Sequence, residues 1–224
     1  MEAANIGARE ADVAPAPAGD PVGGRSAGWT PANPAPLGLA GFAATTFMLS
    51  MINANLVDHT ALTGVLGLAL AYGGIAQLIA GIWEFRTGNT FGAVAFSSYG
   101  AFWISFYFLV TVGLKGVPAK EVDSTIGLYL WTWGIFTSLM FFASLRTTGA
   151  VAVVFLLLAI TYIVLGIGNS ALSGGTASIN GTIKLGGYLG IATAIAAWYT
   201  AIAAVLESTF ARAILPVFPL SRAR

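Results

Sequence analysis

Long apolar runs, separated by short polar segments, make up most of this chain. Six of these runs contain no charged side chain, and each extends over about twenty residues or more. A helix of that length, at about 1.5 Å per residue, crosses the roughly 30 Å of hydrocarbon in a bilayer. Because the segments between the runs are short, consecutive helices should pair as antiparallel hairpins. The pattern therefore predicts an all-α integral membrane protein, a bundle of six transmembrane helices. The predicted spans are residues 36–55, 63–83, 90–113, 124–145, 149–169 and 185–206.

The composition supports this fold class. Of the 224 residues, 57% are hydrophobic and only 8% are charged. Soluble domains carry about 25% charged residues, so this chain lacks the polar surface that a water-facing fold requires. The net charge of +1 gives no reason to expect a nucleic-acid partner.

Cysteine is absent, and histidine occurs once, at His59. The sequence therefore offers no disulfide and no cluster of His or Cys for a metal ion. We expect no metal, no cofactor and no enzymatic activity. His59 follows Asp58 in a predicted loop, and we expect it to be a solvated loop residue.

Residues 1–32 differ in character from the rest of the chain. They are rich in Pro, Ala and Gly and contain no apolar core of the kind that a signal peptide has. We expect residues 1–32 to be a disordered cytoplasmic tail. Residues 33–210 are then the six-helix transmembrane domain, and residues 211–224 a short cytoplasmic tail.

The positive charges are divided unevenly between the two sides of the predicted bundle. Positive residues accumulate on the cytoplasmic side of membrane proteins. Both termini are therefore expected in the cytoplasm, with the protein in the cell inner (plasma) membrane. The side with both termini would hold Arg9, Arg25, Arg86, Arg146, Arg212, Arg222 and Arg224, and the other side only Lys115, Lys120 and Lys184.

Polar side chains inside the spans are candidates to line a path for a solute. A hydroxyl can bond to its own helix, so each Ser or Thr has a structural explanation as well, whereas a buried amide needs an outside partner. No Lys, Arg, Asp or Glu lies in the middle of a span. Such a lining suits a small solute that is neutral, or singly charged and weakly held. The candidate lining residues are Thr46, Asn53, Gln77 and Asn169.

Two further features have alternative interpretations. Glu84, at the cytoplasmic end of the second span, is either an interfacial anchor paired with Arg86 or part of the cytoplasmic mouth of a path. Gly186, Gly190 and Ala194 recur every four residues and form a smooth helix face. Small residues at this spacing let helices approach closely, either inside one subunit or between subunits.

Several short motifs resemble those of the acetate uptake transporter family, the succinate–acetate permeases of bacteria and archaea and their fungal relatives. The resemblance covers roughly residues 33–216. Its motifs are NPAPLGL (33–39), YGGIAQ (72–77), GNTFG (88–92), SYGAFW (98–103), WGIFTSLMFF (133–142), GN (168–169) and LP (215–216).

The resemblance implies a six-helix protomer with its own central pore, assembled as a homo-hexamer in the lipid bilayer. The implied solutes are acetate and other short carboxylates such as succinate. It also implies a hydrophobic constriction, which matches Phe42, Tyr99 and Leu158. Core packing is the alternative interpretation of the first two side chains.

The motif NPAPLGL also has a physical interpretation. Pro34 and Pro36 should hold an extended lead-in, with Pro36 as the first helical residue, where its missing N–H has no cost. This would leave Asn33 near the pore mouth, although a role in starting the helix is the alternative.

We expect a channel-like or proton-linked pathway for acetate; the alternative is a pore for a small neutral solute such as ammonia or urea.

Overall fold

The computed structural model of the protein describes residue 29, residues 31–171 and residues 180–220. The chain divides into residues 1–30 and residues 31–224, and the described helices all belong to the second unit. The predicted tail of residues 1–32 therefore lies almost entirely outside the described residues.

Within that unit, six helical segments are long and apolar enough to cross a membrane. The six-span all-α fold that the sequence predicts is thereby confirmed. The second span is composite, since α2, η2 and α3 follow one another without a break. The helices are α1 (Ala35–Asn53), α2 (Leu62–Leu70), η2 (Ala71–Ala76), α3 (Gln77–Thr87), α4 (Thr90–Thr111), α5 (Val122–Ser144), α6 (Gly149–Ser170) and α7 (Gly181–Phe210), with short 3-10 turns at η1 (His59–Ala61), η3 (Gly113–Gly116) and η4 (Ala119–Glu121).

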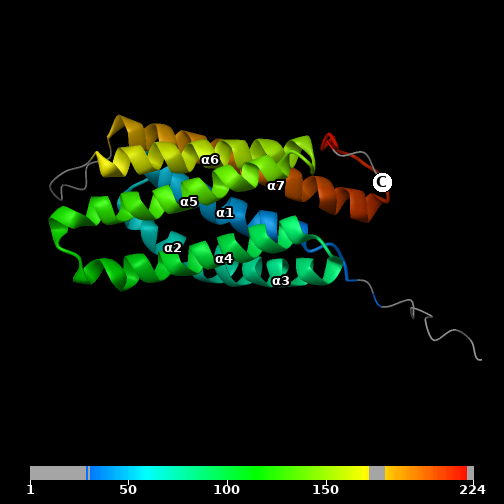
Figure 1. Cartoon of the computed structure of the whole chain (residues 1–224), viewed down its shortest axis with the longest axis horizontal. Helices are drawn as coiled ribbons and strands as arrows, with labels where there is room; N and C mark the ends of the chain where they lie inside the picture. The colour runs from blue at the N-terminus through cyan, green and yellow to red at the C-terminus, as the bar shows by residue number, and fades with distance from the viewer. Residues whose placement is uncertain (1–28, 30, 172–179, 221–224) are drawn as a thin grey trace, which may run out of the picture. The chain divides into compact units, whose positions relative to one another are not determined.

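The helices lie side by side with their connections at two ends (Figure 1). We call the side of the bundle where α1 begins and α7 finishes the terminal end. The opposite side is the loop end. Helices α1, α4 and α6 run from the terminal end to the loop end. Helix α7 packs between α1 and α6, α6 also packs on α5, and α3 packs on α4. Helices α4 and α5 meet mainly through aromatic side chains, such as Phe102 and Trp133, whose ring centroids are 5.1 Å apart.

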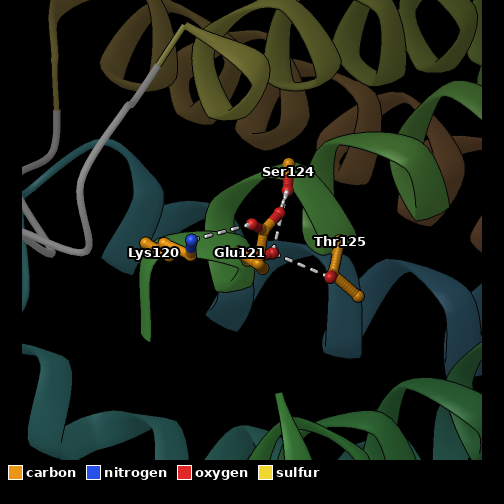
Figure 2. Close-up of polar contacts among 4 residues, drawn as sticks. All are labelled: Lys120, Glu121, Ser124 and Thr125. Carbon is orange, nitrogen blue, oxygen red and sulfur yellow. Dashed lines mark hydrogen bonds and ion pairs between the residues drawn. The ribbon is translucent and has the colours of Figure 1, made fainter. Parts of the chain in front are cut away.

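Polar side chains define where several helices begin. The side-chain oxygens of Asn89, Thr148 and Asn180 accept hydrogen bonds from backbone amides in the first turns of α4, α6 and α7, as N-capping residues do. At the start of α5, the carbonyl of Glu121 accepts from the hydroxyls of Ser124 and Thr125, at 2.9 and 2.8 Å (Figure 2). The Lys120–Glu121 ion pair at 4.0 Å is exposed, so it contributes little to stability.

The start of α1 differs from the sequence-based expectation. Pro34 is in the helical region, with φ −82° and ψ −14°, and Ala35 rather than Pro36 is the first helical residue. The reason is that the Pro34 carbonyl accepts the first amide bonds of the helix, from Leu37 and Gly38. The Asn33 side chain accepts from the Ala35 amide at 3.0 Å, so Asn33 does take part in starting the helix.

The second span is interrupted by a π-helical turn, η2, which the sequence pattern did not predict. Such turns shift the backbone hydrogen-bond register and occur often at functional sites. Glycine allows this turn to approach its neighbours closely. A Cβ on Gly73 would lie 2.5 Å from Thr45 Oγ1 and 2.9 Å from Trp103 Cδ1. Gln77 is the first residue after the turn.

The smooth face of α7 packs inside the chain. A Cβ on Gly186 would lie 2.5 Å from the Leu165 side chain, and one on Gly190 would collide with the hydroxyl of Ser50. Ala194 is fully buried. Of the two interpretations of this face, packing within one subunit is correct, and the face gives no support to an interface between subunits.

Residues 211–220, which we call the return segment, fold back onto the start of α6. Phe218 and Val217 provide carbonyl acceptors for the amides of Gly149 and Ala150, at 2.7 and 3.2 Å. The Tyr199 hydroxyl on α7 donates to the Pro216 carbonyl at 2.8 Å. The first amides of a helix have no partners within it, so the return segment completes the first turn of α6.

Candidate functional site

A cavity of about 240 Å³ lies toward the loop end, among α1, α4, α5 and α6. A single water needs only about 10–15 Å³ of such space, so the cavity can hold a small solute with part of its hydration shell. Aromatic rings from α4, α5 and α6 make up much of its wall. Its polar and aromatic lining residues include Thr46, Ser50, Asn53, His59, Phe102, Trp103, Phe106, Tyr129, Thr161, Tyr162 and Asn169.

A second cavity, of about 20 Å³, lies toward the terminal end, among α1, α3, α4 and α6. It has room for about one water molecule. Phe42, Gln77, Tyr99 and Phe155 are among its lining residues. Leu158 lines both cavities, so the two cavities adjoin at this side chain.

Of the three residues that the family resemblance assigns to a constriction, Leu158 lines both cavities, and Phe42 and Tyr99 line the smaller one. Each is at most 4% exposed. The rings of Phe42 and Tyr99 have centroids 5.9 Å apart. The Tyr99 hydroxyl and Thr137 Oγ1 are 2.8 Å apart and share a hydrogen bond, which fixes the ring between α4 and α5. Large apolar groups at such a point disfavour a continuous column of water.

The structure brings four of the predicted lining residues to these cavities. Thr46, Asn53 and Asn169 line the larger one, and Gln77 lines the smaller one. The Asn169 amide nitrogen donates to the Leu165 carbonyl at 2.8 Å, so part of this amide serves its own helix. In contrast, Thr46 Oγ1 and Gln77 Oε1 are buried without a hydrogen-bond partner among the described residues. Both atoms therefore lack the partner that buried polar groups normally have.

Asn33 and Glu84 line neither of the two cavities. The side chain of Glu84 is only 1% exposed. One of its carboxylate oxygens accepts from the Thr87 hydroxyl at 3.0 Å, and the carboxyl group lies against Gly92 at the start of α4. Among the described residues only Lys120 and Glu121 form an ion pair, so an ion pair between Glu84 and Arg86 is not found.

Several residues that line the larger cavity were not proposed as lining residues from the sequence, among them His59, Trp103 and Tyr162. His59 is exposed, as expected, but it also lines the larger cavity. Tyr162 and Trp103 are 5% and 2% exposed and line the same cavity. Trp103 belongs to the motif SYGAFW, four residues after Tyr99. A spacing of four residues places Tyr99 and Trp103 on one helix face. This spacing is the feature of the sequence that could have identified Trp103 as a lining residue.

Two cavities that share the side chain of Leu158, inside a bundle of six helices that are long and apolar enough to cross a membrane, indicate a membrane transport protein. Comparison with known sequences makes the assignment specific. A sequence model of the GPR1/FUN34/yaaH family matches residues 25–222, and the chain belongs to this family. The resemblance to the acetate uptake transporters that the motifs indicated is thereby confirmed.

The chain is similar to acetate permease A of Emericella nidulans, with 44% identity over 201 residues, 85% of this chain and 67% of that protein. It is 40% identical to the succinate-acetate/proton symporter SatP of Escherichia coli over 187 residues, 83% of this chain and 95% of that one. It is 43% identical to ammonia transport outward protein 2 of Saccharomyces cerevisiae over 179 residues, 78% of this chain and 61% of that one. The chain thus spans about two thirds of the length of these fungal relatives and nearly all of the bacterial one.

The fold is also similar to a solved structure, that of the bacterial acetate channel SatP. The TM-score is 0.74 at 38% sequence identity, and the similarity covers 84% of this chain and 99% of that chain. The relatives are described as transporters or channels, and none of these descriptions names an enzyme.

Proposed function

We propose that this protein passes acetate, and other short carboxylates such as succinate, through the two cavities of its helix bundle. The observation that carries the proposal is the pair of cavities that share the side chain of Leu158 inside the six-helix bundle. The descriptions of similar proteins as acetate permease, succinate-acetate/proton symporter and acetate channel support the choice of solute.

The chemistry of the cavity walls favours channel-like conduction. Among the described residues, no Asp, Glu, Lys or Arg lines either cavity. A monocarboxylate would be held by hydroxyl, amide and indole donors, and a site for permeation must bind weakly enough to release its solute. Without a lining carboxylate to carry a proton, the proton can travel on acetic acid itself.

Uptake of labelled acetate into proteoliposomes, with and without a pH gradient, tests this function. We expect saturable uptake that exceeds the rate in protein-free vesicles and that proceeds down the acetate gradient when the pH is equal on both sides. No acetate uptake above that of the protein-free vesicles would contradict the proposal. Uptake that requires the pH gradient would assign proton coupling instead of channel-like conduction.

A pore for a small neutral solute such as ammonia or urea is the second candidate. Two observations favour it: the uncharged lining of both cavities, and the similarity to a protein named for outward transport of ammonia. The same vesicles distinguish the candidates. Ammonia or urea flux without acetate flux would replace the first proposal with the second.

We also propose that the protein lies in the inner (plasma) membrane of the cell. The terminal end of the bundle then faces the cytoplasm, so that both termini are cytoplasmic. Arg86, Arg146 and Arg212 lie at this end, and the three lysines lie at the loop end, as the charge bias of membrane proteins requires. Asn33 and Glu84 then lie at the cytoplasmic side, where we propose that they border the mouth of the path.

The absence of cysteine from the sequence permits a direct test of this orientation. Lys115 and Arg212 are exposed at opposite ends of the bundle. In intact cells, a membrane-impermeant maleimide should label a Lys115→Cys variant but not an Arg212→Cys variant. After cell lysis, both variants should react. Labelling of Arg212→Cys in intact cells would reverse the assigned orientation.

The family resemblance further leads us to propose a homo-hexamer. The described chain buries its own small-residue face, so the contacts between subunits must use the apolar outer surfaces, such as the exposed Leu128, Ile135 and Leu139 of α5. Native mass spectrometry under mild detergent conditions should show six copies. A distribution of monomers and dimers alone would contradict this assembly.

We predict that Gln77→Ala lowers acetate flux by about tenfold, because the wall of the smaller cavity loses its amide and one charge-assisted hydrogen bond contributes about 1.5–3 kcal/mol. Arg86→Ala and Arg146→Ala should each change the flux by less than about twofold, since these side chains are exposed and remote from both cavities. Initial uptake rates at saturating acetate provide the comparison. Equal effects of the glutamine and arginine variants would contradict this assignment.

A further inference from the structure

Each residue of the constriction is followed, four positions later, by a residue that lines the larger cavity. These followers, which we call the polar layer, are Thr46, Trp103 and Tyr162. They lie on α1, α4 and α6, the three helices that run toward the loop end. Four residues of helix rise about 6 Å, so the polar layer lies one turn beyond the constriction, on the side of the larger cavity.

Two members of the polar layer carry hydrogen-bond donors without partners. Thr46 Oγ1 and Trp103 Nε1 are buried and have no partner among the described residues, and their side chains belong to residues that are 7% and 2% exposed. Buried polar groups in native proteins nearly always have a partner, and one without a partner calls for an explanation.

Other residues of the same two types do have partners, although Glu84 Oε1, Ser97 Oγ and Asp123 Oδ2, away from the two cavities, also lack one among the described residues. Thr45, the residue before Thr46, donates its hydroxyl to the Gly41 carbonyl at 2.9 Å. Trp131 donates its indole N–H to the Ser170 hydroxyl at 3.3 Å. Thus a threonine on the same helix and a tryptophan on α5 find partners inside the protein, while the two that line the cavity do not.

The contacts of Trp103 bring its donor close to α1. A Cβ on Gly73, in the π-helical turn, would touch both Thr45 Oγ1 and the indole Cδ1 of Trp103, at 2.5 and 2.9 Å. The pyrrole edge of the indole, which carries Nε1, therefore lies at the level of Thr45, one residue before Thr46. The ring is held edge-on against Phe102, with centroids 4.8 Å apart. The indole is thus fixed in place by its packing.

We infer that the hydroxyl of Thr46 and the indole N–H of Trp103 form a two-donor binding site for the carboxylate group of the permeating solute, directly before the constriction. This inference rests on the proposed passage of acetate. An ionised carboxylate only accepts hydrogen bonds, and two donors replace part of the water shell that it loses on approaching the apolar constriction. The methyl group of acetate can then point toward the apolar side chains.

At the indole N–H, a carboxylate finds a hydrogen-bond donor, whereas an ammonium ion finds no acceptor, because this group can donate but cannot accept.

The test compares the concentration of acetate at half-maximal uptake among proteoliposomes with matched variants. Thr46→Val removes the hydroxyl and keeps the shape, while Trp103→Phe removes the N–H and keeps an aromatic ring. Each should raise the half-saturation concentration by about tenfold, since a hydrogen bond to a charged group is involved. Thr45→Val and Trp131→Phe remove donors whose hydrogen bonds are made within the protein. For these two variants the half-saturation concentration should stay within about twofold of the wild-type value. Thr46→Ser, which keeps the hydroxyl, should also remain close to the wild type.

The outcomes separate this inference from the proposed function. If the wild-type protein takes up no acetate, the proposed function fails and this site fails with it. If the wild type takes up acetate and the half-saturation concentrations of Thr46→Val and Trp103→Phe equal those of the control variants, the function stands and the two-donor site is wrong. Size-exclusion profiles identify any variant that has lost its fold. If Trp103→Phe has lost its fold, the site is tested by the half-saturation concentrations of the three proteins that carry Val, Ser or Thr at position 46.

Discussion

Phe42→Ala is expected to raise the flux of acetate by about tenfold and to let small inorganic ions leak through the protein. The ring of Phe42 lies against Tyr99 in the wall of the smaller cavity, and the residue is only 4% exposed. Its removal lets water bridge the constriction, and a barrier lowered by about 1.4 kcal/mol corresponds to a tenfold rate. Chloride leakage from loaded proteoliposomes and acetate uptake measure the two effects.

Phe47→Ala provides the matched control for this experiment. Phe47 lies on the same helix and packs on Trp198 with a centroid distance of 5.3 Å, but it lines neither cavity. Its loss should lower the stability without opening the path, because truncation of a packed Phe costs about 3–5 kcal/mol. Similar chloride leakage from both variants would show that general loosening of the bundle, and not the constriction, controls the leak.

Gly187→Ala is expected to destabilise the protein by about 3 kcal/mol or to prevent its folding. A Cβ at Gly187 would collide with the backbone amide of Ala54 and would lie only 2.6 Å from the Ala54 Cα. The obstacle is backbone, so α7 has to move away from α1 as a whole. Overpacking of this kind costs about 1–3 kcal/mol or more. The yield of monodisperse protein and its thermal unfolding in detergent measure the effect.

Gly67→Ala tests whether the effect comes from the contact or from the loss of a glycine. Among the described residues, no atom lies within 4 Å of a Cβ built at Gly67 on α2. Alanine is favoured over glycine in a helix by about 1 kcal/mol, so this variant should be as stable as the wild type or more stable. If Gly187→Ala behaves like Gly67→Ala, the close approach of α1 and α7 is not needed for the fold.

Much of the fold could be predicted from the pattern of apolar residues, because each span needs only length and hydrophobicity. This pattern does not indicate the register of the backbone hydrogen bonds inside a span. The π-helical turn at Ala71–Ala76 was therefore missed, although YGGIAQ was noted as a motif. The same limit applies to the small residues of α7: their spacing predicts a close contact but does not say with which helix.

For the candidate site, the family resemblance proposed a constriction at three residues that do line the cavities, and chemistry identified four polar lining residues. Trp103 was missed because a tryptophan in a span is usually explained by packing or by interfacial anchoring. Only the fold shows that Trp103 lines a cavity and that its buried N–H has no partner among the described residues. Asn33 shows the opposite case, since its side chain bonds nearby backbone. Glu84 is intermediate: one carboxylate oxygen accepts from the Thr87 hydroxyl, and the other has no partner among the described residues.

The return segment has a consequence for the order in which this protein can be assembled during translation. The amide of Gly149 is bonded to the carbonyl of Phe218, which is synthesised 69 residues later (218 − 149). At about 5–20 residues per second, this delay is on the order of ten seconds, during which all of α7 is also made. A nascent chain therefore carries α6 with an unfinished first turn until the last span has been synthesised.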